Sequence, residues 1–166
     1  MDWETYENLV GDRFDDLPPT LARQMTADVY AAAHANLGRR ADCGPRGERR
    51  PRSGAIVRRV LEAHARAHLA RVPSTLTPAE WGALLAAHGY RCAYCGVPGG
   101  THMDHVVPLS RGGENTAANV APACRACNLS KRALPLDVWA EQRGLDLASV
   151  LARIDEARAR AFGGAS

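Results

Sequence analysis

Two Cys-x-x-Cys pairs constrain this chain most, Cys92-Ala-Tyr-Cys95 and Cys124-Arg-Ala-Cys127. Each pair can present two thiolates from one tight turn, and two such pairs are the arrangement that builds a tetrahedral four-cysteine zinc site. The 28 residues between the pairs exceed the spacing of about 15–20 that is common in such sites, so we expect an inserted structural unit. The fifth cysteine, Cys43, lies in a polar stretch and is predicted to be a free thiol.

The composition is that of a globular protein, with 46% hydrophobic and 23% charged residues among 166. No apolar run approaches the roughly 20 residues of a membrane span. The acidic start, MDWETYENLV, does not resemble an export signal. We therefore expect a soluble intracellular protein, in which a disulfide framework is the weaker interpretation of the cysteines.

Positive charge is concentrated in one segment. Residues 39–72 carry ten arginines and three acidic residues, whereas residues 1–38 carry seven acidic and two basic residues. A basic block of this kind favours a polyanionic partner, with nucleic acid as the default. The alternative is a solvated, arginine-rich helix and linker in a chain that has twenty arginines and a single lysine.

The periodicity of apolar residues predicts helices over 19–38 and 55–71, separated by a linker rich in Gly, Pro and Arg over 42–54. A capping box, Thr77-Pro-Ala-Glu80, predicts a helix that runs to about His88 and ends at Gly89. Further helices are expected over 136–143 and from Asp146 to about residue 157.

Between the cysteine pairs the pattern changes. Residues 103–109 predict a short strand, 110–115 a turn, 119–122 an edge strand and 124–134 a helix that ends before a proline. The predicted order is knuckle, strand, loop, strand, knuckle, helix. Trp81 and Trp139 flank this unit and are predicted to lie in the core.

The run from Cys92 to Lys131, with Asp104-His105, Asn119 and Asn128, resembles the HNH endonucleases, the ββα-metal nucleases with an embedded Cys₄ zinc. The resemblance covers residues 77–132, a third of the chain. It implies an α+β fold with a small ββα-metal core flanked by N-terminal and C-terminal helices. We divide the chain into an acidic helical segment (1–38), a basic linker and Arg-rich helix (39–72), an HNH nuclease domain (73–135) and a C-terminal helical extension (136–166).

Cleavage of a phosphodiester bond needs a general base and positive charge on the phosphate. His105 is the candidate base, because imidazole titrates near neutral pH. Its neighbour Asp104 leaves the opposite face of the strand, so one side chain can hold a metal while the other faces the attacking water. The resemblance implies that Asn128 is the second ligand of a catalytic Mg²⁺ or Mn²⁺, that Asn119 steadies the loop that bears the base, and that the Cys₄ zinc is structural.

The family usually has histidine where this chain has Asn128, and asparagine there resembles the phage resolvase-type branch. His102 lies two residues before Asp104 and is either an aid to the metal or phosphate, or a surface residue. DNA contacts are assigned to six basic residues: Arg111, Lys131, Arg132, Arg49, Arg50 and Arg52.

The prediction is therefore a metal-dependent endonuclease acting on DNA, double-stranded by expectation, in the cytoplasm of a bacterial cell or a phage-infected host. Residues 1–72 are a possible surface for a protein partner. Two alternatives stay open. One is a non-catalytic, zinc-stabilised DNA-binding module. The other is an adaptor whose basic linker binds an acidic protein.

Overall fold

The computed structural model describes residues 51–163. The predicted helix over 19–38, most of the basic linker, Cys43, Arg49 and Arg50 lie outside this range. The described elements, in chain order, are α3 (Ser53–Ala70), α4 (Pro78–Ala87), β1 (His102–His105), the 3₁₀ turn η2 (Leu109–Arg111), β2 (Val120–Ala123), α5 (Arg125–Lys131), α6 (Leu136–Gln142) and α7 (Leu147–Phe162).

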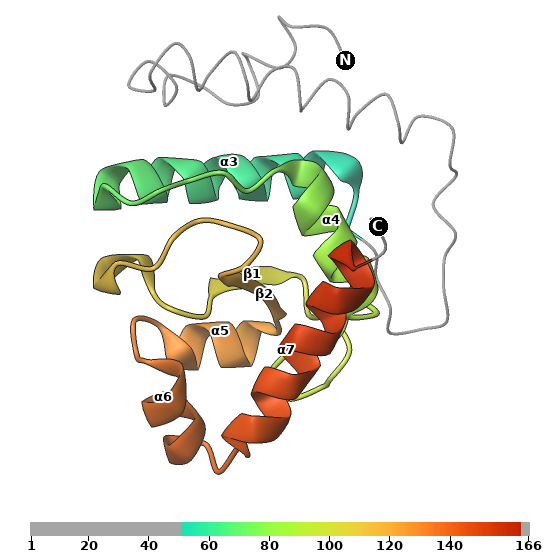
Figure 1. Cartoon of the computed structure of the whole chain (residues 1–166), viewed down its shortest axis with the longest axis vertical. Helices are drawn as coiled ribbons and strands as arrows, with labels where there is room; N and C mark the ends of the chain where they lie inside the picture. The colour runs from blue at the N-terminus through green and yellow to red at the C-terminus, as the bar shows by residue number, and fades with distance from the viewer. Residues whose placement is uncertain (1–50, 164–166) are drawn as a thin grey trace, which may run out of the picture.

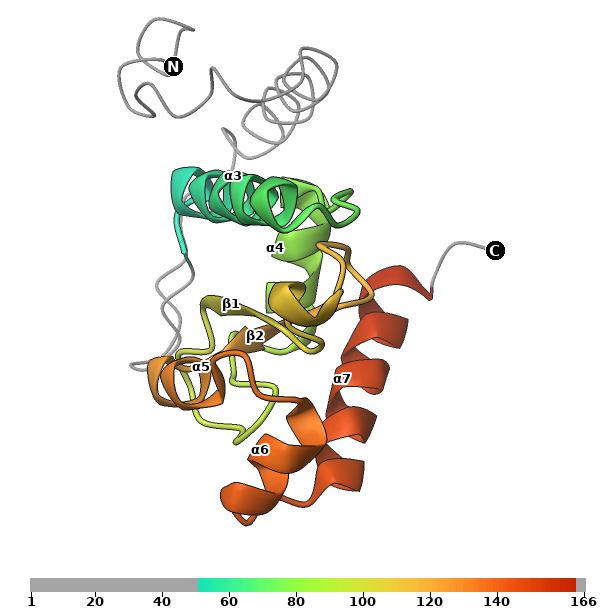
Figure 2. The ribbon, with the colours of Figure 1, turned by 90° about the vertical axis from the view of Figure 1, so that its left-hand side faces the viewer.

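The strands β1 and β2 form a two-stranded antiparallel sheet at the centre of the molecule (Figure 1). In its register, Asp104 pairs with Ala121 and His105 with Val120. The helix α3 lies on one side of the sheet and α5 on the other, while α7 runs along the flank (Figure 2). This mixture of helices around a small sheet confirms the predicted α+β class.

Two hydrophobic clusters cover the two faces of the sheet, because successive strand residues point to opposite sides. The first joins α3, α4 and one face of the sheet through Val60, Leu76, Trp81, Leu85, Met103 and Val120. The second joins the other face to the cysteine pairs, α6 and α7 through Tyr94, Ala121, Ala123, Trp139, Val150 and Ile154. The flanking helices therefore share both clusters with the segment between the cysteine pairs, and Trp81 and Trp139 are buried as predicted.

Helix ends follow local chemistry closely. The Thr77 hydroxyl accepts the Glu80 amide and the Glu80 carboxylate accepts the Thr77 amide, which is the predicted capping box at the start of α4. The Asp146 carboxylate accepts the Ser149 amide at the start of α7. The helix α5 is shorter than predicted, because Arg132 adopts a φ of 49° directly after Lys131 and ends it.

The strand predicted over 103–109 is also shorter than expected. It ends at His105, and the chain then bends into the turn η2. Within residues 51–163, no helix has the length and apolar character needed to cross a membrane.

Candidate active site and metal centre

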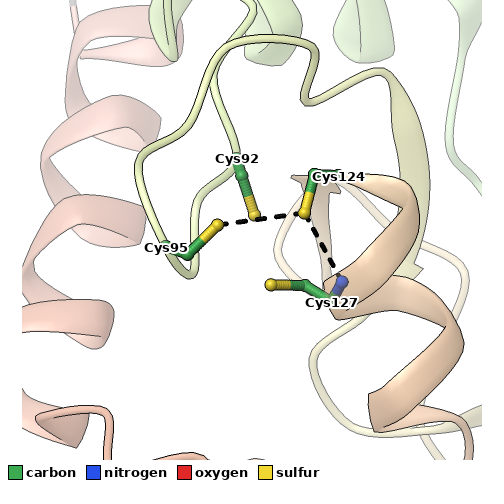
Figure 3. A group of neighbouring side chains, drawn as sticks. All are labelled: Cys92, Cys95, Cys124 and Cys127. Carbon is green, nitrogen blue, oxygen red and sulfur yellow. Dashed lines mark hydrogen bonds between the residues drawn. The ribbon is translucent and has the colours of Figure 1, made fainter.

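The four cysteines of the two pairs meet at one point (Figure 3). Their Sγ atoms all lie within 4.8 Å of one another, and the Sγ atoms of Cys95 and Cys124 are 3.8 Å apart. Four sulfurs bound tetrahedrally at about 2.3 Å from a zinc ion would be about 3.8 Å apart. The donor set and its spacing therefore fit a structural Cys₄ zinc site.

Backbone hydrogen bonds within each Cys-x-x-Cys turn position the sulfur atoms. In the first knuckle, Gly96 donates its amide to the Cys92 carbonyl and has a φ of 74°, which favours glycine. In the second, the Cys124 sulfur accepts the Cys127 amide at the start of α5. Burial raises the pKa of the Cys92 thiol to about 11. A bound cation would have the opposite effect, because thiolate is the form that ligates zinc.

Asp104 lies in the interior, 7% exposed, on the sheet face that α5 covers. The Lys131 ammonium is 3.0 Å from its Oδ2 and also donates to the His105 carbonyl oxygen at 2.7 Å. The Tyr94 hydroxyl donates to the same Oδ2. Both partners therefore engage one carboxylate oxygen, and Oδ1 has no hydrogen-bond partner among residues 51–163.

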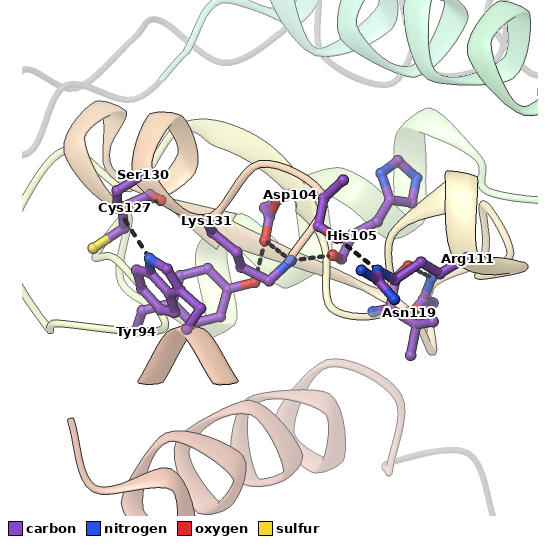
Figure 4. Close-up of polar contacts among 11 residues, drawn as sticks. Tyr94, Asp104, His105, Arg111, Asn119, Cys127, Ser130 and Lys131 are labelled. Atoms are coloured by element: carbon purple, nitrogen blue, oxygen red, sulfur yellow. Dashed lines mark hydrogen bonds and ion pairs between the residues drawn. The ribbon is translucent and has the colours of Figure 1, made fainter. Parts of the chain in front are cut away.

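His105 points away from the Asp104 carboxylate, as the alternation along β1 predicts (Figure 4). It is 5% exposed, and its Nε2–H donates to Oδ1 of Asn115 at 3.0 Å. Burial lowers the pKa of His105, and the hydrogen bond to Asn115 opposes that effect. The imidazole is therefore neutral near pH 7 and able to accept a proton.

Asn119 ties together the loop that follows His105. Its Oδ1 accepts the Val107 amide at 2.9 Å, and its Nδ2 donates to the carbonyls of Val107 at 2.9 Å and Glu114 at 2.7 Å. Gly113 lies beside this amide, where an added Cβ would sit 1.9 Å from the Val107 oxygen. A side chain at Gly113 would therefore break the loop geometry that Asn119 maintains.

Asn128 lies in α5, directly after Cys127, and α5 packs against β1. Within the described range its side-chain amide makes no hydrogen bond. His102 is partly exposed, and its pKa is lowered by burial and then by Arg59 and Arg125.

The predicted DNA contacts fall in different places. Arg111 and Arg132 are exposed and line a hollow of about 580 Å³ beside the end of α5. Arg52 is exposed at the start of α3. Lys131 is instead fully buried at 0% exposure, so its ammonium meets Asp104 and not the surface where a phosphate contact was expected.

Two residues of this site carry no prediction from the sequence. Tyr94 lies between the cysteines of the first pair, and Asn115 lies in a segment whose composition predicts only a turn. The sequence around them contains no local signal that either would be buried. Each is placed by a partner at least ten residues away.

A two-stranded sheet, a helix packed on it and a four-cysteine cluster at their junction define a cysteine-clamped ββα module. Residues 92–133 match the family model described as HNH endonuclease, and this segment is an HNH endonuclease domain.

Two curated proteins are similar to this chain, both named CRISPR-associated endonuclease Cas9. The protein of Corynebacterium diphtheriae is 36% identical over 72 residues, and that of Actinomyces naeslundii is 36% identical over 78 residues. These alignments cover 41% and 45% of this chain but only 7% of each relative. No solved structure matches the chain.

Proposed function

We propose that this protein is a metal-dependent endonuclease that hydrolyses phosphodiester bonds of DNA, with His105 as the general base. The observation that carries the proposal is that the side chains of two consecutive residues of β1 are each held by a buried side chain from another segment. Asn115 holds the imidazole of His105, and Lys131 holds the carboxylate of Asp104. A base and a hard oxygen ligand at fixed positions are what hydrolysis of a phosphodiester requires.

His105 would take a proton from the attacking water. Its lowered pKa supports this role, since a neutral imidazole is the form that accepts a proton. The Asn119 bonds to Val107 and Glu114 would keep the loop after β1 in one conformation, so that the imidazole keeps its place.

Asp104 and Asn128 would hold the catalytic Mg²⁺ or Mn²⁺. Carboxylate and amide oxygens suit these hard cations. Oδ1 of Asp104 and the side-chain amide of Asn128 are uncommitted within residues 51–163, which supports the assignment. When bound, such an ion would stabilise negative charge that develops on the phosphate.

The basic side of α3 would contact the DNA backbone. Arg52, Arg59 and Arg66 recur every seven residues and so lie along one side of this helix. The helix packs against η2, which lies a few residues after His105, the last residue of β1. We assign phosphate contacts to this row and to Arg111 and Arg132, and expect binding that weakens steeply with salt.

The runner-up is a non-catalytic, zinc-stabilised DNA-binding module. The burial of both His105 and Asp104, at 5% and 7% exposure, favours it. It keeps the cysteines and arginines but gives these two side chains no chemical task.

A plasmid-cleavage assay separates the two functions. Supercoiled DNA is incubated with Mg²⁺ or Mn²⁺ and the wild-type protein, His105→Ala, Asp104→Asn or the control His68→Ala, which changes an exposed histidine of α3. The endonuclease predicts a loss of about 10²-fold or more in rate for His105→Ala. Equal rates for the wild type and His105→Ala, with zinc content and DNA affinity unchanged, would support the binding module.

A further inference from the structure

A line of polar contacts connects His105 to the helix α3. Oδ1 of Asn115 accepts from His105, and Nδ2 of Asn115 donates to Oγ of Ser74 at 2.9 Å. Oγ of Ser74 lies 2.6 Å from Nδ1 of His64, whose Nε2 lies 2.8 Å from the Leu76 carbonyl oxygen. His64 and Ser74 stand outside the segment 92–133 that matches the HNH family model.

The direction of every hydrogen bond in this line follows from its far end. A carbonyl oxygen only accepts, so Nε2 of His64 must donate to Leu76. In a neutral imidazole the other nitrogen then accepts, and the Ser74 hydroxyl donates its proton to Nδ1 of His64. The Ser74 oxygen is left to accept from Nδ2 of Asn115, and this turns Oδ1 of the amide toward His105.

The same hydrogen bonds with donors and acceptors exchanged would require an unfavourable state of His64. If the Asn115 amide were turned over, its Oδ1 would take the Ser74 proton, and Nδ1 of His64 would have to donate to Ser74. Both nitrogens of His64 would then carry protons. Burial lowers the pKa of His64 and so disfavours this charged form. The environment therefore supports one direction only.

We propose that His64 and Ser74, acting through Asn115, are positioning residues that hold His105 as the Nε2–H tautomer and so leave the lone pair on Nδ1. This inference rests on the proposed function for the part that concerns turnover. The tautomer itself is a property of the folded protein, with or without DNA. The hydrogen bond made by one ring nitrogen decides which nitrogen remains free to act as a base.

The hydrogen bonds between His64, Ser74 and Asn115 can be interrupted at Ser74 while the backbone hydrogen bonds that position Asn115 remain. The backbone N–H of Asn115 donates to the backbone carbonyl of Pro73, and the backbone carbonyl of Asn115 accepts the backbone N–H groups of Thr75 and Leu76, all at 2.9–3.0 Å. These bonds do not involve the Ser74 hydroxyl. Ser74→Ala therefore removes the link, and Ser74→Thr keeps a hydroxyl at the same place.

The direct test is nitrogen-15 NMR of the histidine rings in the full-length protein. We expect the Nε2–H tautomer for His105 in the wild type and in Ser74→Thr, and a mixture of tautomers in Ser74→Ala. Asn115→Ala removes both atoms of the amide and is expected to give the larger change. Asn115 is fully buried, so Asn115→Ala can prevent folding. In that case the comparison of Ser74→Ala with Ser74→Thr is the test.

Turnover supplies the second readout. With Mn²⁺ and saturating DNA, Ser74→Ala should lower kcat about tenfold with little change in KM, and Ser74→Thr should restore it. An Nδ1–H tautomer in the wild type, or the same tautomer in the wild type and Ser74→Ala, would overturn the inference. A protein without nuclease activity whose His105 tautomer still depends on Ser74 would refute the proposed function and support this inference.

Discussion

The ammonium of Lys131 lies 3.0 Å from Oδ2 of Asp104, although the two residues come from different elements, α5 and β1. The lysine side chain is fully buried, and it also reaches the His105 carbonyl oxygen. The Lys131 ammonium therefore fixes both the carboxylate of Asp104 and the backbone of the next residue. A buried charge pair of this kind is costly to break, because the remaining charge has no compensation.

The ion pair yields a stability prediction. Lys131→Met, which removes the charge but keeps an unbranched apolar side chain one atom shorter, should lower the free energy of unfolding by about 3–5 kcal/mol. Adding Asp104→Asn should recover a large part of that loss, since no buried carboxylate is then left unpaired. Urea unfolding of the two variants and of the exposed control Arg125→Ala measures this. A loss below about 1 kcal/mol for Lys131→Met would contradict a desolvated pair.

The proposed ligands of the catalytic metal ion can be tested by a metal titration. If Asp104 and Asn128 hold a divalent ion, Asp104→Asn and Asn128→Ala should each weaken Mn²⁺ binding about tenfold or more. Calorimetry on zinc-loaded, DNA-free protein measures the affinity. Glu114→Gln, on the exposed loop before Asn115, is the matched control and should bind as the wild type does. Unchanged Mn²⁺ affinity in both ligand variants would place the cation elsewhere.

The cysteine cluster predicts one zinc ion per chain. Cys95→Ser removes a ligand that is exposed and makes little core contact, so any large loss of stability must come from the metal. We expect loss of zinc and unfolding of the segment 92–132, because a zinc site supplies folding free energy directly. Native mass spectrometry and circular dichroism are the measurements, with Cys43→Ser as the control. Full zinc occupancy in Cys95→Ser would contradict a four-cysteine site.

The features of the fold and site that could be predicted from the sequence are those with local causes. The capping box at Thr77 placed the start of α4, and alternation along β1 placed Asp104 and His105 on opposite faces. The spacing of the two cysteine pairs predicted that the four sulfurs would meet. Each of these follows from residues that are neighbours in the chain or from a motif with one known geometry.

The features that the sequence did not reveal depend on distant partners. Lys131 reads as a surface lysine, but it is buried because a carboxylate 27 positions earlier in the chain compensates its charge. Asn115 reads as a turn residue, but it is buried because the main chain at Pro73 pairs with it. His64 lies in a helical pattern and becomes part of the site through Ser74. No local pattern encodes such contacts, since they exist only after the segments pack.

The helix α7 predicts a second stability effect near the first knuckle. The Arg153 guanidinium donates to the carbonyls of Ala93 and Tyr94, so the last described helix holds the turn between Cys92 and Cys95. Arg153→Ala should lower the free energy of unfolding by about 2 kcal/mol, as expected for hydrogen bonds to a charged group. Arg160, an exposed residue in the same helix, provides the control. Arg160→Ala should lower the free energy of unfolding by less than about 1 kcal/mol. Thermal unfolding of the two variants measures both losses. Equal losses would remove Arg153 from the support of the knuckle.

The end of α4 predicts how stability depends on pH. Burial, followed by the charges of Arg160, Arg158 and Arg153, lowers the pKa of His88 to about 4. The ordinary value in an unfolded chain is about 6.5, so between these two values the unfolded state binds more protons than the folded state. The contribution of His88 is therefore complete above pH 6.5 and is lost as the pH falls toward 4.

His88→Gln isolates this contribution from those of the other histidines. We expect the free energy of unfolding, measured by urea titration between pH 4.5 and 7.5, to fall less steeply with acid in the variant than in the wild type. NMR titration of His88 provides the independent check, and Arg160→Ala should raise its pKa toward the ordinary value by removing a nearby positive charge. Parallel stability curves for the wild type and His88→Gln would show that His88 titrates normally in the folded protein.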